Sequence, residues 1–307
     1  MRLVTRSDFD GLTCAVLLKE VEQIDSVEFV HPKDIQDGKI KVGPNDILTN
    51  LPYQTGVGIW FDHHSSETIR NDMEETPFKG RFDVAPSAAR VVFDHYVEQG
   101  KGAKLRKYKK LLEVVDKSDS AQLSVKDVTK PTGWILLSYV MDPRTGLGYQ
   151  RDYAISNREL MGKMIDWIPT MKLAELVKQP DVKARIDRYF KDQEAFVAIL
   201  KKHSKLDKNV VVTDLRGVPN VPSGNRFLIY TLFPKSNISV RVFPGKPGIT
   251  VCAVGHSIFR RTSKTDVGKL MGKFGGGGHR GAGTCQLPDD TANAQLKKIL
   301  ASIKRSG

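Results

Sequence analysis

Two clusters of acidic and imidazole side chains follow predicted strands. Asp8 and Asp10 come after the strand-like segment 2–5, and Asp62-His63-His64 ends the apolar run 58–61. Because the carboxyl ends of parallel strands meet at one edge of a sheet, residues far apart in the sequence come together there. Carboxylates with imidazole suit Mn²⁺ or a similar divalent ion, whereas a soft thiolate site needs cysteines that these positions lack. The two clusters therefore predict one shared metal site.

The spacing of Asp8 and Asp10 allows two interpretations. On extended backbone, residues two apart point the same way, so both carboxylates would reach one cation. Aspartate is also a favoured residue at the N-cap of a helix, so Asp8 could instead cap the helix that follows it. Both interpretations stay open at this point.

Alternating strands and helices must position these residues. In the first half of the chain, apolar runs indicate four strands and an amphipathic helix. The strands are expected at Arg2–Thr5, Val27–Val30, Asp46–Asn50 and Gly58–Phe61, and the helix at Leu12–Val21. This order predicts an α/β fold in which a parallel sheet has helices on both faces.

Further helices are expected from Pro86 through Tyr96 and at 107–115, 134–140, 152–167 and 181–203, the last being long and polar like a connector. After Lys208 the pattern changes to short strands at 210–213, 227–233, 238–243 and 249–254, a helix at 265–273, a strand at 284–287 and a helix at 291–303. We therefore expect a catalytic domain over 1–185, a connector helix over 186–207 and a smaller α/β domain over 208–307.

Composition limits the class of protein. The chain has 307 residues, enough for two cores, and is 40% hydrophobic and 27% charged, as expected for a protein that folds throughout. No apolar stretch approaches the roughly 20 residues that span a bilayer, and the start lacks a signal-peptide layout. Cys14, Cys252 and Cys285 have no paired or metal-binding spacing, so we expect a cytoplasmic protein in a reducing compartment.

The net charge of +13 favours an anionic substrate. Much of the excess lies in two basic runs, 101–110 and 201–205. Such runs attract polyanions, but they are also typical of solvated helix faces. The charge alone does not separate these alternatives.

A glycine run from Gly275 to Gly278, followed by His279 and Arg280, is the second chemical signal. Consecutive glycines let backbone amides approach an anion, and the two cationic residues add donors, which together predict a phosphate cradle. The alternative is a flexible turn. Upstream, Ser257, Arg260 and Arg261 lie where they could face the same anion or simply the surface.

These motifs together resemble the DHH phosphoesterases that carry a DHHA1 domain, and more closely their bacterial exopolyphosphatase-like members. The Asp-x-Asp turn, Asp62-His63-His64 and Gly-Gly-Gly-Gly-His occur in that order over nearly the whole chain. The resemblance implies an active site in a cleft between two domains, where Mn²⁺ assists the attack of water on phosphorus. Family substrates include short RNA, phosphoadenosine phosphate, single strands and linear or cyclic dinucleotides.

The resemblance also implies roles for individual residues. Asp8, Asp10 and His63 would be metal ligands, His64 would lie near the scissile phosphate, and Asp62 would orient the site or touch the metal. The last family carboxylate falls in the segment 115–120, where we favour Asp119 over Asp116. The substrate's terminal phosphate or nucleotide would be held by Gly276, Gly277, Gly278, His279 and Arg280, with Arg260 and Ser257 nearby.

Two departures from the family pattern concern the metal count. Where the family has a histidine before its first aspartate, this chain has Val4 and Arg6, and where it has a bridging aspartate, this chain has Asn50. An asparagine oxygen binds a hard cation but lacks the charge that holds two dications together. Our hypothesis is that one metal is held by Asp10, His63 and Asp119, and that the Arg6 guanidinium replaces the other ion.

An ordinary salt bridge from Arg6 to Asp8 or Asp62 is the alternative to that hypothesis. The cofactor is therefore expected to be one or two Mn²⁺ ions, with Mg²⁺ or Co²⁺ as alternatives, and Asn50 stays a candidate ligand. The function expected is a metal-dependent phosphoesterase acting on short single-stranded oligonucleotides, dinucleotides or related nucleotides. An exopolyphosphatase and a catalytically impaired phosphate-binding regulator are the rivals, no membrane is involved, and a homodimer is left open.

Overall fold

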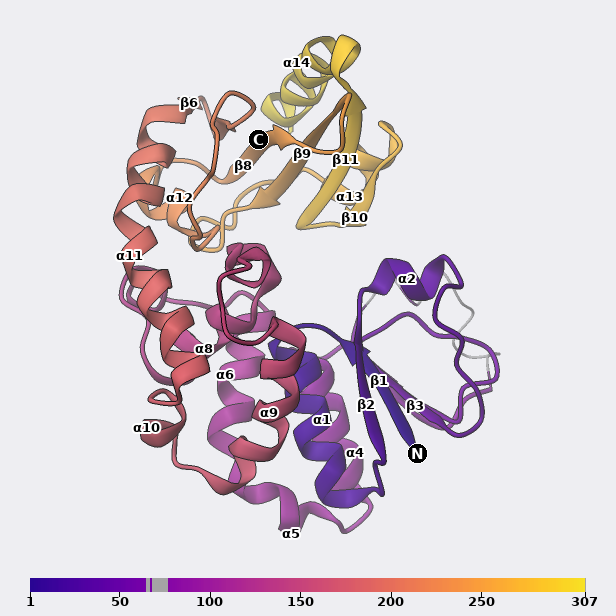
Figure 1. The fold of residues 1–307 in the computed structure, drawn as a ribbon. Coiled ribbons are helices and arrows are strands. Elements are labelled where there is room, and N and C mark those ends of the chain that lie inside the picture. The colour runs from indigo at the N-terminus through magenta and orange to yellow at the C-terminus, as the bar shows by residue number, and fades with distance from the viewer. Residues whose placement is uncertain (65–66, 68–76, 307) are drawn as a thin grey trace. The chain divides into compact units, whose positions relative to one another are not determined.

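The computed structural model describes residues 1–64, 67 and 77–306. It consists of two compact units, Met1–Gln122 with Pro131–Arg188, and Leu123–Lys130 with Tyr189–Gly307 (Figure 1). The change from the first unit to the second falls inside helix α11 (Pro180–His203), in the segment that we expected to connect two domains.

The first unit is built on a five-stranded parallel sheet with the order β2-β1-β3-β4-β5. Its strands are β1 (Arg2–Arg6), β2 (Ser26–Val30), β3 (Asp46–Thr49), β4 (Ile59–Asp62) and β5 (Gly80–Phe82). The predicted parallel α/β fold is confirmed. The sequence analysis missed β5, because a strand of three residues is too short to show an alternating pattern.

Helices cover both faces of this sheet. On one face lie α1 (Phe9–Val21) and α4 (Ala88–Glu98), with α6 (Lys109–Asp119) and α9 (Asn157–Thr170) packed outside α1 (Figure 1). On the other face lies the short α2 (Pro32–Gln36), whose Ile35 joins a buried core around Trp60. Trp60 anchors this layer, since its Nε1 donates to the Leu51 carbonyl oxygen at 2.9 Å.

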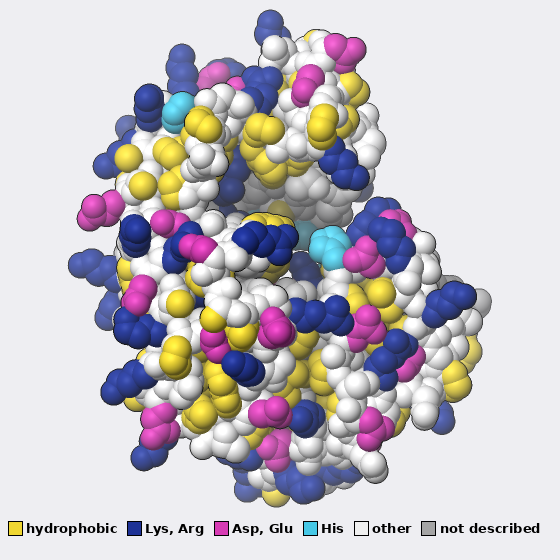
Figure 2. Space-filling view, in the orientation of Figure 1, with side chains coloured by type: hydrophobic (Ala, Val, Ile, Leu, Met, Phe, Trp, Pro, Cys, Tyr) yellow, Lys and Arg dark blue, Asp and Glu magenta, His cyan; other side chains and the backbone are white. Residues whose placement is uncertain are grey.

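The rest of the first unit consists of short helices. They are α5 (Gly102–Leu105), α8 (Gly133–Met141), α10 (Leu173–Leu176) and the 3₁₀ turns Arg106–Tyr108, Pro143–Thr145 and Leu147–Tyr149. The basic run 101–110 forms α5 and the start of α6, and two of its lysines pair with the end of α1. Lys101 and Lys107 reach Glu22 at 3.1 Å and Glu20 at 2.8 Å. On the face shown in Figure 2, Lys and Arg side chains are scattered among Asp and Glu.

The second unit is built on a six-stranded mixed sheet with the order β10-β11-β9-β8-β7-β6, in which only β7 and β8 run parallel. The strands are β6 (Ser204–Asp207), β7 (Val210–Asp214), β8 (Ile238–Pro244), β9 (Ile249–His256), β10 (Gly277–His279) and β11 (Ala282–Pro288). Helices α13 (Val267–Gly272) and α14 (Asp289–Arg305) share one buried core with this sheet.

One prediction for this unit is wrong. The expected strand 227–233 is helix α12 (Leu228–Leu232), which contacts α7 (Val125–Thr129). A short apolar run fits a buried helix as well as a strand, and here three consecutive residues of the helix are buried. The glycine run is not a bare turn, because Gly277–His279 pairs with β11 as a strand.

No helix in the described residues is long and apolar enough to cross a membrane.

Candidate functional site

Asp10 is buried in the first turn of α1, where it faces the start of α4. Its Oδ1 accepts from the Ala89 amide at 2.8 Å and its Oδ2 from the Ala88 amide at 2.9 Å. Burial raises the pKa of Asp10 well above its ordinary value, and the charges of Asp119 and Asp8 raise it further. The expectation that Asp8 and Asp10 share extended backbone is wrong, because Asp10 is helical and only Asp8 is extended.

His63 brings an imidazole nitrogen to this carboxylate. Its Nδ1 lies 3.0 Å from the Ala85 carbonyl oxygen, which assigns the ring proton to Nδ1 and leaves a lone pair on Nε2. Nε2 lies 3.8 Å from Asp10 Oδ2 and 3.3 Å from Asp119 Oδ2, and within the described part of the chain it has no hydrogen-bond partner. Three acceptor atoms that face one another fit a divalent cation.

Asp119 and Asp116 lie on the same helix but have different surroundings. Asp119, at the end of α6, joins the cluster with Asp10 and His63. Asp116 is held by the Ser87 hydroxyl at 2.7 Å and by Arg90 Nε at 3.0 Å. A carboxylate that already has a guanidinium partner is less available to a metal, so the geometry favours Asp119 as the ligand.

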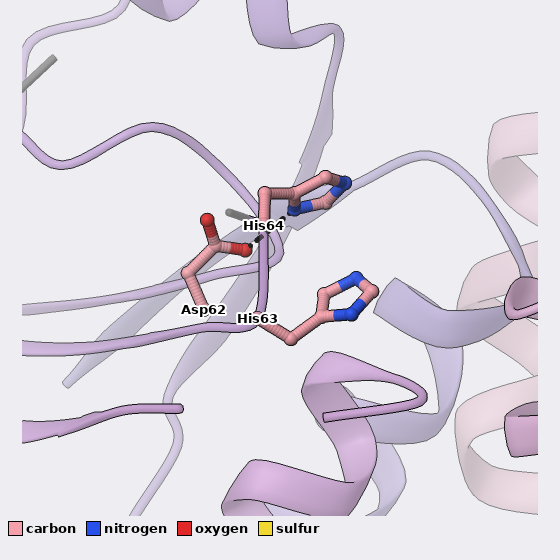
Figure 3. A group of neighbouring side chains, drawn as sticks. All are labelled: Asp62, His63 and His64. Atoms are coloured by element: carbon pink, nitrogen blue, oxygen red, sulfur yellow. Dashed lines mark hydrogen bonds and ion pairs between the residues drawn. The ribbon is translucent and has the colours of Figure 1, made fainter. Parts of the chain in front are cut away.

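The end of β4 places Asp62 and His64 side by side. His64 Nδ1 lies 2.8 Å from Asp62 Oδ1, and the Asp62 side chain is buried. Figure 3 shows the carboxylate turned toward the His64 ring, while the His63 ring extends away from it. Asp62 therefore fixes the orientation of His64 and leaves the Nε2 edge of that ring for another group. Asp62, His63 and His64 also form a second group whose possible metal-ligating atoms lie close to one another.

Asp8 lies outside both of these sets and has three protein donors. Arg6 Nε lies 2.8 Å from its Oδ2, while Asn50 Nδ2 and the Gly11 amide donate to its Oδ1 at 3.1 and 3.0 Å. The Gly11 bond makes Asp8 the N-cap of α1, the second of the two interpretations. The alternative of an Arg6–Asp8 salt bridge is thus present. Arg6 Nη1 also lies 3.5 Å from His64 Nε2.

Asn50 combines strained backbone with an unsatisfied oxygen. It has a φ of 55°, in the left-handed region that asparagine tolerates better than most residues. Its side chain is buried, and no donor among the described residues reaches its Oδ1. Asn50 thus orients Asp8 with its amide and keeps one oxygen available.

The sequence analysis missed backbone groups and one arginine around this cluster. The Ala85 carbonyl and the amides of Ala88 and Ala89 orient the ligands, but alanine carries no chemical signal in a sequence. Arg144 lies in a turn without a motif. Although desolvation lowers its pKa, the charge of Asp142, with Asp8 and Asp119 at longer range, raises the pKa of Arg144 overall. Arg144 Nε donates to Asp142 Oδ1 at 2.7 Å, so this exposed guanidinium already has a carboxylate partner.

The predicted phosphate-binding residues lie in the second unit. The Ser257 hydroxyl accepts from the Phe259 and Arg260 amides at 3.3 and 3.0 Å, so this buried serine shapes the turn. The guanidinium of Arg260 donates to the Lys235 carbonyl oxygen at 2.6 Å, and that of Arg261 to the Ile258 carbonyl oxygen at 3.2 Å. These contacts tie the segment to its own backbone and to the turn before β8.

The glycine run has structural tasks of its own. The amides of Gly275 and Gly276 donate to the carbonyl oxygens of Gly272 and Met271, closing the end of α13. Gly278 has a φ of 149°, and a Cβ there would lie 2.2 Å from the Ala282 carbonyl oxygen. His279 is exposed, and its Nδ1 accepts from the Gly281 amide at 3.1 Å. Arg280 is exposed beside it.

Comparison with known proteins identifies the family. The pGpG-specific phosphodiesterase PggH of Vibrio cholerae is 43% identical to this chain, with a TM-score of 0.84, and the match covers 100% of this chain and 99% of that one. An exopolyphosphatase-related protein of Bacteroides fragilis shares the fold at 11% identity and a TM-score of 0.56, covering 99% of this chain and 92% of that one.

The exonuclease RecJ of Thermus thermophilus, solved with Mn²⁺, also shares the fold, at 15% identity and a TM-score of 0.53 over 99% of this chain and 52% of that one. No protein-family model and no curated protein sequence matches. The chain belongs to the DHH phosphoesterase family and is a hydrolase of phosphoesters.

Proposed function

We propose that this chain hydrolyses the phosphodiester bond of short guanine dinucleotides such as pGpG. The observation that carries the proposal is the 43% identity to a pGpG-specific phosphodiesterase over 100% of the chain. The rival exopolyphosphatase function has weaker support, since the exopolyphosphatase-related protein is 11% identical and shares only the fold. The rival of an impaired binding protein has less support, since the similar protein PggH is a phosphodiesterase and three ligand atoms here lie close enough together to hold one cation.

One Mn²⁺ or similar ion would be held by Asp10, His63 and Asp119, with Asn50 Oδ1 as a further candidate oxygen. The support is that His63 Nε2, which has no hydrogen-bond partner among the described residues, lies 3.8 Å from Asp10 Oδ2 and 3.3 Å from Asp119 Oδ2. A cation bound there lowers the pKa of water and polarises a phosphoryl oxygen. The amides at the start of α4 and the Ala85 carbonyl keep the ligands oriented.

Arg6 supplies positive charge for the phosphate in place of a second ion. Its side chain is 28% exposed, and its Nε is tied to Asp8, so the guanidinium is held in place while part of it faces solvent. A planar cation of this kind binds phosphate oxygens and stabilises the negative charge that develops as the bond breaks. Asn50 is neutral, so it adds no charge that would hold another dication.

His64 is placed to donate a proton to the leaving oxygen. Asp62 binds the ring at Nδ1 and thereby presents Nε2, which lies near Arg6. A histidine oriented by a carboxylate serves as a general acid when its other nitrogen reaches the departing group. His279 and Arg280, exposed beside the glycine hairpin, are proposed to hold the substrate's terminal phosphate.

The location proposed for the protein is the cytoplasm. Its three cysteines are buried and unpaired, which agrees with a reducing compartment.

The test is product release by the purified full-length chain with Mn²⁺ on pGpG, pApA and polyphosphate. We expect mononucleotide from pGpG, little phosphate from polyphosphate, and no turnover by a His63→Ala variant. Phosphate release from polyphosphate without dinucleotide cleavage would reverse the assignment. Metal analysis of the same sample should give one Mn²⁺ per chain, and two tightly held ions would remove the role given to Arg6.

A further inference from the structure

The sheet of the second unit has two different faces. Along β8, Ile238, Val240 and Val242 enter the core shared with α13 and α14. Because side chains alternate along a strand, Ser239 and Arg241 point to the opposite face. A charged residue in the middle of β8, flanked by strands on both sides, is unusual enough to require an explanation.

Arg241 is partly buried and has no acidic partner. Across the described ranges, no hydrogen bond or ion pair reaches its guanidinium. Burial lowers the pKa of Arg241, and the Tyr230 hydroxyl opposes this shift. The arginines at other structural positions differ, since Arg2, for example, binds Asp46 and Glu28. A guanidinium held out of water without an acceptor is suited to an acceptor on a ligand.

The neighbours of Arg241 toward β11 have short side chains. In the register of the sheet, Arg241 on β8 lies opposite Ala253 on β9, and Ala253 lies opposite Thr284 on β11. Ala253 is partly exposed and Thr284 exposed, so short side chains cover about two strand spacings, roughly 10 Å, beside the guanidinium. On the same face Tyr230 closes one end, since its hydroxyl lies 2.7 Å from Ser239 Oγ and from the Gly255 carbonyl oxygen.

We propose that Arg241 reads a guanine base of the substrate, donating two parallel hydrogen bonds to the base edge that carries O6 and N7. This inference rests on the proposed function and adds the group that selects guanine. Arginine is the side chain that matches this pair of acceptors, and adenine presents a donor at the position of O6. The sheet face of alanine and threonine supports the base without adding charge.

The test compares kcat/KM for pGpG and pApA in the Mn²⁺-loaded full-length chain, for wild type and Arg241→Met. Methionine keeps much of the length of arginine and removes the donors. We expect the preference for pGpG over pApA to fall about 10- to 100-fold, mainly through KM for pGpG, while pApA changes less than about threefold. Arg305→Met, on α14 at the opposite face, is the matched control and should keep the wild-type ratio.

Equal losses on both dinucleotides would show that Arg241 contacts phosphate and would overturn guanine reading, and wild-type kcat/KM values on both dinucleotides would remove Arg241 from the site. Melting temperatures of both variants separate misfolding from loss of recognition, since misfolding lowers activity on both substrates without changing the ratio. A wild-type chain that cleaves neither dinucleotide would defeat the proposed function itself, a result distinct from these.

Discussion

Asp8 and Asp10 are two residues apart in the sequence and lie in opposite electrostatic surroundings. Asp10 faces His63 and Asp119, a group of acceptors that lacks a positive charge among the described residues. Asp8 is paired with Arg6 and also accepts from Asn50 and Gly11. Asp10 is therefore suited to bind a cation from solution, whereas the cationic partner of Asp8 is Arg6, a residue of the chain itself.

This difference indicates how a site can lose one metal and keep its charge balance. A dication brings two positive charges and strict ligand demands, whereas a guanidinium brings one charge and a fixed set of donors. In the proposed site Arg6 takes the place of one ion, which would make half of the site independent of metal supply. Substitutions around Asp10 and substitutions around Asp8 should therefore affect metal binding and activity separately.

The largest effect is expected on the side of Asp10. His63→Ala removes the nitrogen at the centre of the cluster, so we expect Mn²⁺ affinity to fall and kcat/KM on pGpG to drop about 10³-fold or more. Calorimetric titration with Mn²⁺ and product release measure the two effects. His31→Asn is the control, because His31 is exposed and caps α2, a task that asparagine also performs. Full metal binding by His63→Ala would place the ion elsewhere.

Substitution of Arg6, the partner of Asp8, should lower activity without lowering Mn²⁺ binding. For Arg6→Met we expect kcat/KM to drop about 10²- to 10³-fold, the range seen when one preorganised donor to a developing charge is removed. Mn²⁺ stoichiometry should be unchanged. A loss of Mn²⁺ together with activity would contradict the separation of the two sides.

Removing Arg6 also leaves the buried Asp8 without its charged partner, which destabilises the fold. The double variant Arg6→Met/Asp8→Asn corrects for this, because it removes both charges. Its melting temperature should recover toward that of the wild type while its activity stays low. Recovery of activity would mean that Arg6 serves only to neutralise Asp8.

A smaller effect distinguishes two aspartates on one helix. Asp119→Asn should weaken Mn²⁺ binding about 10- to 100-fold with little change in stability, because no donor among the described residues binds Asp119, whose neighbour at 3.3 Å is the unprotonated His63 Nε2. Asp116→Asn should keep Mn²⁺ affinity but lower stability by about 1.5–3 kcal/mol, through its bonds to Ser87 and Arg90. Metal titration and denaturant unfolding of both variants check this, and the reverse pattern would exchange the two roles.

The sequence predicted which strand ends carry this site better than it predicted how the individual side chains there are placed. β1 to β4 follow from apolar runs, and the clusters after β1 and β4 follow from the rule that parallel strands end at one edge. The helical position of Asp10 did not follow, because the helix begins at Phe9, earlier than its amphipathic pattern. Helix α12 was predicted as a strand and β10 was not predicted, because neither a short apolar run nor a glycine run has a distinctive period.

The pairing of Asp8 was accessible to sequence reasoning only as an alternative, since which donor reaches a carboxylate depends on the tertiary fold. The same holds for Arg241. Alternation along β8 predicts its face, but the absence of an acceptor is a property of the folded sheet.

The smallest effect concerns a histidine in the first unit that is not part of the metal cluster. Burial lowers the pKa of His95, next to Phe61, so the folded state favours the neutral ring. The unfolded chain then binds more protons as pH falls below about 6.5, and folding stability should decrease from there downward. Denaturant unfolding at pH 8 and pH 5.5 should show a smaller loss for His95→Gln than for the wild type. Equal losses would assign the acid sensitivity to other groups, of which His256, also lowered in pKa by burial, is the next to replace.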